Sequence, residues 1–419
     1  MHPPRPPLRH QAARRAPLLR RELVGGNQGL KSSSSSPRSP PRKLLRVGTL
    51  ELACEPPSSA HPLEMYVIRR HSVLKILMDR VRSKLGRGGF GTVVLAEDTI
   101  TETAVAIKLL HKDPDLHEDV RHEEKVYRAL LAGCDPRIEL FAEAITSGTH
   151  RGFHCIVFEL CGATLYDMVN GCMELLPFSG RHVLEIAYQL VNAVGYLHSL
   201  GIIHTDLKLD NIAVRDQATT TIRWLSPQTG FEEKKILVTT QICVLDLGGA
   251  VISPGPSHSG RVGTRPYRSP EVTLGLPWGF GVDVFAVGVV IAELYLGNQL
   301  FSGDISCDRE HLAALNRVLG PFTRAYAHTI ETRFPGTFNL NEGDVKVHYP
   351  PPNTTVTRDS YGAPMRRLER MRPLLADVHE PELADLLKKL MALDPAKRVS
   401  LDVAAKHTYF DGVGRGGWC

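Results

Sequence analysis

The sequence lacks three features that would each point to a special class of protein. Its eight cysteines form no Cys-x-x-Cys pair, so we expect neither a disulfide framework nor a zinc site, but reduced intracellular thiols. No uninterrupted run of about eighteen apolar residues occurs, since the longest apolar stretch, 287–296, contains Gly288 and Glu293. We therefore expect no transmembrane span and, from the N-terminal composition, no apolar secretory leader. No internal repeat is present.

What is present is an ordinary composition with an uneven charge. Hydrophobic residues make up 42% and charged residues 23% of the 419 residues, which excludes a wholly disordered, collagen-like or membrane-embedded protein. Residues 1–62 hold 11 Lys or Arg against 3 Glu, a balance of +8, and the remainder holds 39 against 42, a balance of −3. A basic tail on a slightly acidic body indicates an address or contact segment attached to a domain that can take a cationic partner.

The tail, residues 1–62, is rich in proline, serine and arginine, with a serine run at 32–36. Because it cannot bury enough apolar surface to offset chain entropy, we expect it to be disordered. Its basic clusters admit three interpretations, namely a nuclear-import or nucleic-acid-contact segment, a mitochondrial presequence, or a merely solvated basic tail. Prolines at 3, 4, 6 and 7 argue against a presequence helix. We expect a nuclear or cytoplasmic location, with the mitochondrion as the alternative.

From about residue 63 the pattern changes to folded structure. Alternating apolar residues at 92–96 and 104–109 predict strands. Between residues 183 and 197, apolar positions recur every three or four residues and predict a helix. A β-rich first part followed by a helix-rich second part predicts an α+β protein in two lobes. We place the N-lobe at about 63–160, the C-lobe at about 161–411 and a short tail at 412–419.

A glycine-rich stretch lies between two of the predicted strands. Residues 86–93 read Gly-Arg-Gly-Gly-Phe-Gly-Thr-Val, and glycines let backbone N–H groups approach phosphate oxygens closely. A Rossmann turn would look similar, but that motif opens a helix, whereas residues 92–95 continue as a strand.

Lys108 follows at the end of an apolar strand and needs an anionic partner. The candidate partner is Glu123 on a predicted helix, and Glu124 is the alternative. Either glutamate could instead simply lie on the solvent-exposed face of that helix.

The strongest signal is the sequence His-Thr-Asp-Leu-Lys-Leu-Asp-Asn at 204–211, followed by Asp-Leu-Gly at 246–248. This spacing puts a base, a cation and an amide oxygen on one loop, and Asp246 supplies a second carboxylate for a metal. Phosphoryl transfer needs this set, because its transition state is stabilised mainly by positioning and charge neutralisation. The sequence Tyr-Arg-Ser-Pro-Glu follows at 267–271.

In these motifs the sequence resembles a protein kinase over about residues 78–411, which implies a two-lobed kinase fold with a β-rich N-lobe and a helical C-lobe. Residues 283–288, Asp-Val-Phe-Ala-Val-Gly, are like the family's D-x-W-x-x-G. In the family, the arginine matching Arg398 pairs with the glutamate matching Glu271. Leu247 replaces the usual Phe of D-F-G, and a bulky apolar residue can still pack there.

Within the kinases, the sequence resembles the CDC-like (LAMMER) branch of the CMGC group, with some features of the SR-protein kinases. Thr205 stands where most kinases have arginine, and residues 215–241 form a long insert. Residues 310–320, Glu-His-Leu-Ala-Ala-Leu-Asn-Arg-Val-Leu-Gly, are similar to the signature that names the branch, and depart from it at 314, 315, 316 and 318. The resemblance implies Ser/Thr phosphorylation of proteins such as Arg/Ser-rich splicing factors, with tyrosine autophosphorylation.

The resemblance also assigns roles. Asp206 would orient the acceptor hydroxyl and take its proton, while Lys208 would neutralise charge on the moving phosphoryl group of ATP. Asn211 and Asp246 would hold Mg²⁺ through oxygen ligands, and Lys108, held by Glu123, would contact the α- and β-phosphates. The expected ATP contacts, in the phosphate loop, the adenine pocket and the hinge behind Phe158, are Leu85, Gly86, Arg87, Gly88, Gly89, Phe90, Gly91, Val93, Ala106, Lys108, Glu159 and Cys161. Phe158 has an equally good packing role.

Two other functions remain open. A pseudokinase scaffold would bind partners without transferring phosphate, although all five polar catalytic positions are occupied by the expected residue types. A small-molecule phosphotransferase generally lacks the anchor formed by Glu271 and Arg398. We expect protein substrates, no direct nucleic-acid binding by the kinase domain, no membrane association and a monomer. Thr264 is expected to bond the catalytic aspartate and lysine, and Asp210 is a candidate partner for a substrate arginine.

Overall fold

The computed structural model describes residues 81–413, with gaps at 90, 99–100, 111–116, 134, 151–152, 227–229, 253–256, 341–342, 353 and 355–357. The chain divides into two units, Met1–Ser58 and Ser59–Cys419, and all described residues belong to the second. The predictions for the tail 1–62, for residues 63–80 and for most of 412–419 therefore lie outside the described residues.

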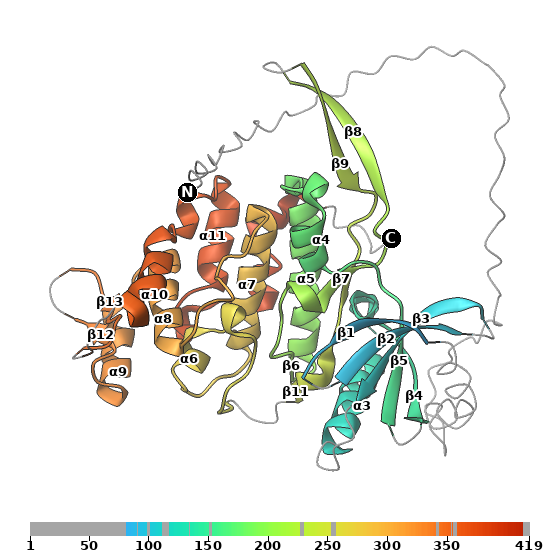
Figure 1. The fold of residues 1–419 in the computed structure, drawn as a ribbon, viewed down its shortest axis with the longest axis horizontal. Coiled ribbons are helices and arrows are strands. Elements are labelled where there is room, and N and C mark those ends of the chain that lie inside the picture. Colours follow the sequence, from blue (N-terminus) through green and yellow to red (C-terminus); the bar gives the residue numbers. More distant parts are fainter. Residues whose placement is uncertain are drawn as a thin grey trace, which may run out of the picture. The chain divides into compact units, whose positions relative to one another are not determined.

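The first part of the described chain is a five-stranded antiparallel sheet in the order β1-β2-β3-β5-β4 (Figure 1). Its apolar side chains alternate along the strands, so that one set, including Val105, Ile107 and Val157, forms a small buried core. The strands are β1 (Val81–Arg87), β2 (Gly91–Asp98), β3 (Thr103–Leu110), β4 (Ala144–His150) and β5 (Phe153–Glu159). Helix α3 (His117–Ala132) follows β3 and contributes Val126, Tyr127 and Leu130 to the main core.

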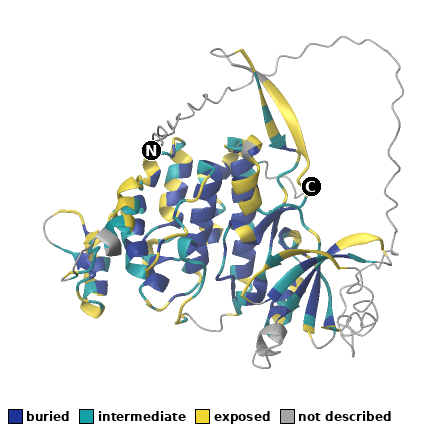
Figure 2. Cartoon of the chain, viewed as in Figure 1, coloured by how far each residue is buried: buried dark blue, intermediate teal, exposed yellow. Residues whose placement is uncertain are grey.

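The second part is helical, as the sequence predicts. Helix α7 is buried nearly all round, and the dark blue along α5 and α7 in Figure 2 marks the centre of this part. Gly288 permits the close approach of α7 to the end of α11, because a Cβ there would lie 2.5 Å from Met391 Cγ. The helices are α4 (Leu165–Gly171), α5 (Gly180–Ser199), α6 (Pro270–Thr273), α7 (Gly281–Leu296), α8 (Asp308–Leu319), α9 (Arg324–Arg333), α10 (Arg358–Arg370), α11 (Pro381–Leu390) and α12 (Leu401–Ala404).

Two short strand pairs bring the predicted catalytic segments together. Strand β6 (Ile202–Ile203) pairs with β11 (Val251–Ile252), and β7 (Ile212–Val214) pairs with β10 (Ile242–Val244). The loop 204–211 runs from β6 to β7, and the segment 245–250 runs from β10 to β11. The two pairs therefore fix both segments at both of their ends.

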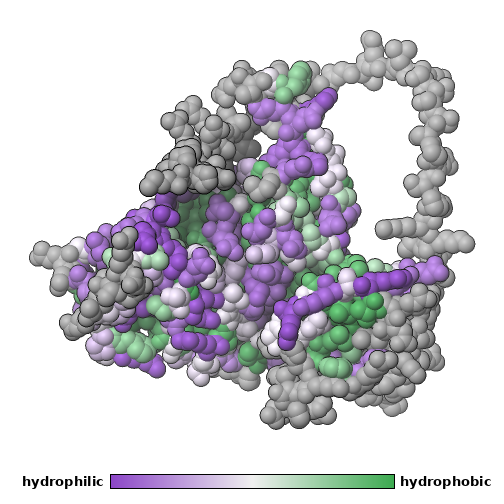
Figure 3. Space-filling model, in the orientation of Figure 1, coloured by the Kyte–Doolittle hydropathy of each residue, from purple (hydrophilic) through white to green (hydrophobic). Residues whose placement is uncertain are grey.

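The long insert contains a hairpin of β8 (Thr219–Ser226) and β9 (Gly230–Leu237). It projects away from the helices in Figure 1, and in Figure 3 its coloured surface is largely hydrophilic. A further small pair, β12 (Phe338–Asn339) with β13 (Lys346–Val347), follows α9. Of the helices in the described part of the chain, none has the length and hydropathy that crossing a bilayer requires.

Candidate active site

Lys108 lies at the centre of a buried charge cluster. Its Nζ donates to Oε1 and Oε2 of Glu123, both at 2.9 Å, and to Oδ1 of Asp246 at 2.6 Å. The predicted pairing with Glu123 is therefore present, whereas Glu124 contacts His154 at 3.1 Å. The cluster joins β3, α3 and the segment that follows β10, so it holds Lys108, the predicted phosphate contact, in one orientation.

Two of the three charged groups in this cluster, Lys108 and Asp246, keep their charge in spite of burial, whereas burial raises the pKa of Glu123 above its ordinary value. Burial alone would lower the pKa of Lys108, but the carboxylates of Glu123 and Asp246 outweigh it and hold this pKa above its ordinary value. Burial alone would raise the pKa of Asp246, yet the ammonium of Lys108 holds it below its ordinary value. Lysine and aspartate are thus both ionised near neutral pH, which is the state that binding a metal-phosphate requires.

Asp206 and Lys208 meet on the loop between β6 and β7. Lys208 Nζ donates to Asp206 Oδ2 at 2.8 Å and to Thr264 Oγ1 at 3.1 Å. Thr264 in turn donates to Asp206 Oδ1 through its backbone N at 2.8 Å and its Oγ1 at 2.7 Å. Thr264 thus lies where it was expected, and it fixes the direction in which the Asp206 carboxylate points.

A buried carboxylate on α7 holds the first residues of the loop 204–211 in place. Asp283 accepts from the backbone N of His204 at 2.7 Å and of Thr205 at 2.9 Å, and its Oδ2 lies 3.1 Å from His198 Nε2. Thr205 has a φ of 72°, a left-handed conformation that is strained for a β-branched residue. The threonine hydroxyl donates to Gly249 O at 2.8 Å. Asp283 and Gly249 together hold the strained backbone that precedes Asp206.

Asn211 and Asp246 supply oxygen atoms on the two facing segments. Asn211 Nδ2 donates to Asp206 O at 2.8 Å, so its amide oxygen is the atom that can bind a metal. Asp246 has a φ of 58°, and its Oδ1 accepts from Lys108 Nζ at 2.6 Å. A carboxylate and an amide oxygen are hard ligands, and they fit Mg²⁺.

The glycine-rich loop joins β1 to β2, and Phe90 within it lies outside the described residues. Gly88 N donates to Gly91 O at 2.9 Å and closes the turn. A Cβ on Gly91 would lie 2.2 Å from Leu109 O, so only glycine fits between β2 and β3. Cβ atoms at Gly86, Gly88 or Gly89 would meet no described atom within 4 Å. This leaves the phosphate-facing part of the loop open, and Arg87, Leu85 and Val93 border it on β1 and β2.

The hinge follows β5. Ala106 pairs with Phe158, whose ring is buried against Tyr127 with centroids 5.4 Å apart. Glu159 N donates to Glu143 O at 3.0 Å, while its carboxylate binds Arg215 Nη1 through both oxygens at 2.7 Å. The side chain of Glu159 therefore binds Arg215, a contact that the sequence motifs did not predict. Cys161 is partly buried beyond it, and the cysteines at 155, 161, 172, 243 and 307 are free thiols.

Two contacts anchor the segment that follows Asp246. Leu247 is fully buried in the main core, which is the packing expected for the residue that replaces Phe. Arg398 binds both oxygens of Glu271, with its Nη1 at 2.7 Å from Oε1, and both side chains are buried. The predicted anchor is therefore present. Sequence reasoning missed the supporting roles of Asp283 and Arg215, and for Asp283 the motif at 283–288 was the available signal.

Comparisons with known proteins agree with this geometry. A family model described as a protein kinase domain matches residues 80–410. The chain is 33% identical over 330 residues to the dual specificity protein kinase lkh1 of Schizosaccharomyces pombe, across 78% of this chain and 46% of that protein. It is 33% identical to the dual specificity protein kinase CLK4 of Mus musculus and 35% identical to CLK1 of Homo sapiens, across 78% of this chain and 65% and 64% of those proteins.

The chain therefore spans about half to two thirds of the length of these curated relatives. Among solved structures, the crystal structure of a kinase domain matches with a TM-score of 0.67 at 23% identity, covering 80% of this chain and 96% of that one. This likeness confirms the fold.

Proposed function

The chain belongs to the protein kinase domain family, and we propose that it transfers the γ-phosphoryl group of ATP to serine and threonine hydroxyls of proteins, with its own tyrosines as further acceptors. The observation that carries this proposal is the complete network in which Thr264 joins Asp206 to Lys208 while Lys108 joins Glu123 to Asp246. The dual specificity kinases among the relatives support the same reaction.

The reaction follows from the positions of these groups. The acceptor hydroxyl lies against Asp206, and its oxygen attacks the γ-phosphorus while the bond from that phosphorus to the β-bridging oxygen breaks. The hydroxyl proton passes to Asp206, and Lys208 neutralises charge on the transferred group. Lys108 orients the α- and β-phosphates. Asn211 and Asp246 would hold Mg²⁺, which would neutralise phosphate charge and make ADP a better leaving group.

A pseudokinase scaffold is the alternative that an experiment must exclude. The full chain should transfer labelled γ-phosphate from MgATP to a peptide of Arg-Ser repeats, and should not label a panel of sugars, choline and aminoglycosides. Binding of MgATP with no transfer to peptide, or to the chain itself, would favour the scaffold. Labelling of a small molecule but not of the peptide would favour a small-molecule phosphotransferase.

For the substrate class, we propose serines flanked by arginine, such as those of Arg/Ser-rich splicing factors. The body outside the tail carries −3, and Asp210 lies exposed two residues after Lys208, where its carboxylate can accept from a substrate guanidinium. Replacing arginine by glutamate in the peptide should lower kcat/KM, and added salt should weaken the preference. Equal kcat/KM values for both peptides would rule out this substrate class without touching the kinase assignment.

The tail provides two further proposals. Its serines between 32 and 39 lie among Arg and Pro, so we propose autophosphorylation there, which mass spectrometry after incubation with MgATP would detect. Its basic clusters favour import into the nucleus over retention in the cytoplasm. A fluorescent fusion that keeps the same compartment after deletion of 1–62 would show that the tail does not determine the location.

We also propose that the chain is a monomer, which sedimentation would test.

A further inference from the structure

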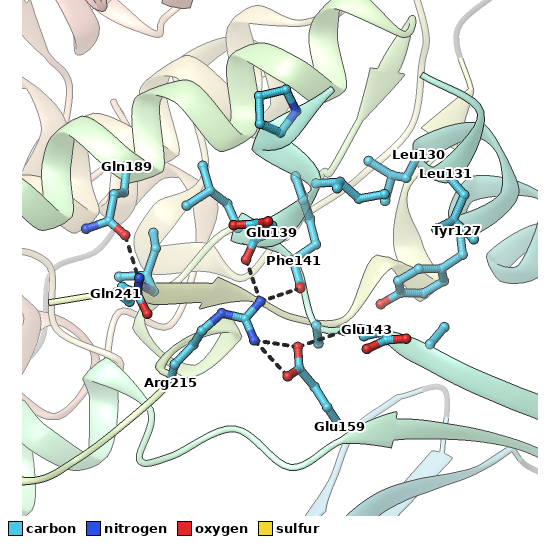
Figure 4. A pocket seen from close by; sticks show the side chains of 16 residues that line it. Tyr127, Leu130, Leu131, Glu139, Phe141, Glu143, Glu159, Gln189, Arg215 and Gln241 are labelled. Carbon is cyan, nitrogen blue, oxygen red and sulfur yellow. Dashed lines mark hydrogen bonds and ion pairs between the residues drawn. The ribbon is translucent and has the colours of Figure 1, made fainter. Parts of the chain in front are cut away.

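A cavity of about 490 Å³ lies behind the hinge (Figure 4). Its walls come from the end of α3, the 3₁₀ turn Pro136–Leu140, the start of β4, the hinge, α5 and the base of the insert. Neither the described residues of the glycine-rich loop nor Lys108, Asp206, Asn211 or Asp246 line it. Of the predicted nucleotide contacts that the structure describes, only Glu159 borders the cavity, and it does so with its side chain. A volume of this size takes several side chains of a partner.

The lining carries an excess of negative charge. It contains the carboxylates of Glu139, Glu143 and Glu159 and one cation, Arg215. Arg215 neutralises Glu159 through a two-oxygen contact. Among the described residues, no hydrogen bond or ion pair engages the carboxylates of Glu139 and Glu143, and both residues are exposed. The cavity therefore offers two unpaired negative charges to an incoming group.

A buried hydroxyl points into the same space. Tyr127 is only 7% exposed, and its hydroxyl has no hydrogen-bond partner among the described residues. Figure 4 shows its ring reaching toward the cavity from α3, with the oxygen at the inner end. Burial raises the pKa of Tyr127 well above its ordinary value, so the group stays a neutral hydroxyl. A buried polar group without a partner is unfavourable, and a ligand in the cavity would supply one.

The chain itself shows how a guanidinium is held in this place. Arg215 bonds the Glu159 carboxylate and also donates to the backbone oxygens of Glu139 and Phe141. A second guanidinium has enough N–H donors to bond a carboxylate and the phenol oxygen at once, which an ammonium does less well. Leu130, Leu131 and Ile138 add apolar walls, and these favour a segment that also carries apolar side chains.

We propose that this cavity is a second binding site, separate from the nucleotide and acceptor sites, for an arginine-bearing and partly apolar segment of a protein partner. The proposal goes beyond the phosphotransfer activity and does not require turnover. Because Tyr127 follows Glu123 by one helical turn on α3, an occupied cavity is in contact with the helix that holds Lys108.

The test is a binding measurement on the full chain. The probe is a fluorescein-labelled peptide of alternating Arg and Leu without Ser, Thr or Tyr, followed by fluorescence anisotropy in saturating Mg²⁺ and a non-hydrolysable ATP analogue. Excess Arg-Ser acceptor peptide is added to fill the acceptor site. The probe should remain bound under these conditions, and salt should weaken it because the contacts are ionic.

Variants of the lining should then weaken the probe. Replacing both Glu139 and Glu143 by Lys should raise the Kd about tenfold or more. Tyr127→Phe, which deletes only the hydroxyl, should raise it about threefold without lowering the urea midpoint, since the hydroxyl is unpaired in the free chain. The matched controls are Glu382→Lys, an exposed acid on α11, and Tyr326→Phe, whose hydroxyl is also buried and unpaired but lies elsewhere. Both should leave the Kd within about twofold.

Three outcomes would overturn the proposal. The first is an unchanged Kd in the doubly substituted chain, provided that its urea midpoint and phosphotransfer rate show it to be folded. The second is displacement of the probe by the acceptor peptide with the same inhibition constant in the unchanged and the doubly substituted chains, which would place the probe in the acceptor site. The third is binding of spermine, but not of the peptide, with the spermine lost when Glu139 and Glu143 are replaced. This result would make the occupant a small polyamine.

Discussion

The glycine-rich loop and the loop 204–211 are both predicted to act on phosphate groups, but the chain holds them in opposite ways. Strand β1 is exposed along nearly its whole length, with Leu85 50% exposed, and Figure 3 shows hydrophobic side chains on the visible face of the N-terminal sheet. In the loop 204–211, His204, Leu207 and Leu209 are fully or almost fully buried. We infer from this difference that a loop lying over phosphates needs unobstructed backbone N–H groups. A carboxylate that acts as a base needs hydrogen-bond partners that fix its direction.

The partners of the catalytic loop come from distant segments. Asp283 is 79 residues from His204, and Thr264 is 58 residues from Asp206. By contrast, the glycine turn closes on itself through the bond from Gly88 to Gly91. Substitutions that remove a partner should therefore be severe in the catalytic loop and mild in most of the glycine-rich loop.

The largest effect is expected for Asp206→Asn. This change removes the proton acceptor at nearly constant volume, so kcat should fall about 10²–10⁴-fold. MgATP affinity, measured by calorimetry, should stay close to that of the unchanged chain, because Asp206 is predicted to contact the acceptor and not the nucleotide. Turnover at the original rate would show that Asp206 is not the base.

Next in size is Asp283→Asn. An amide in this place presents an NH₂ group to backbone N–H groups that now meet a carboxylate, and the free energy of unfolding should fall by about 3 kcal/mol. Urea denaturation measures it, with the exposed Asp304→Asn as the control. Equal midpoints for the two variants would mean that the catalytic loop does not depend on α7.

A pair of glycine substitutions then divides the glycine-rich loop. Gly91→Ala forces a Cβ to within 2.2 Å of Leu109 O and should lower the free energy of unfolding by about 2 kcal/mol. Gly88→Ala meets no described atom within 4 Å and should change it by less than about 0.5 kcal/mol. If both variants melted alike, the contrast between the anchored and the open part of this loop would be lost.

Thr264→Val should have a smaller effect than the substitutions of Asp206, Asp283 and Gly91. The valine keeps the backbone bond to Asp206 but loses the two hydroxyl contacts, to Asp206 and to Lys208. Loss of charge-assisted bonds in the site should lower kcat about tenfold, and KM for ATP should change less. Thr264→Ser, which retains the hydroxyl, is the matched control and should keep most of kcat in a steady-state assay.

Local patterns and charge explain what the sequence could predict. The alternation of apolar residues predicted the strands β2 and β3. The lysine on a buried strand predicted an acidic partner on the next helix, but only the structure shows that this partner is Glu123 and not Glu124. The roles assigned to Asp206, Asn211 and the glycine-rich loop come from motif order and stay predictions.

What the sequence could not predict depends on contacts across the fold. Arg215 meets Glu159 from 56 residues away, with no spacing rule to announce it. The cavity behind the hinge combines side chains from α3 to β10, and only their packing shows that Tyr127 has an unpaired hydroxyl. The hairpin β8–β9 was visible only as an insert of unassigned structure.

The contacts of Asp283 also determine how slowly one part of the chain exchanges its amide hydrogens. The N–H groups of His204 and Thr205 both end on this buried carboxylate, so deuterium reaches them only when α7 separates from the loop. Such opening belongs to the unfolding of the core, whereas exposed strands exchange through small local fluctuations. The predicted catalytic loop should thus have the exchange lifetime of a core helix, and two of its amides should report on the integrity of the whole C-lobe.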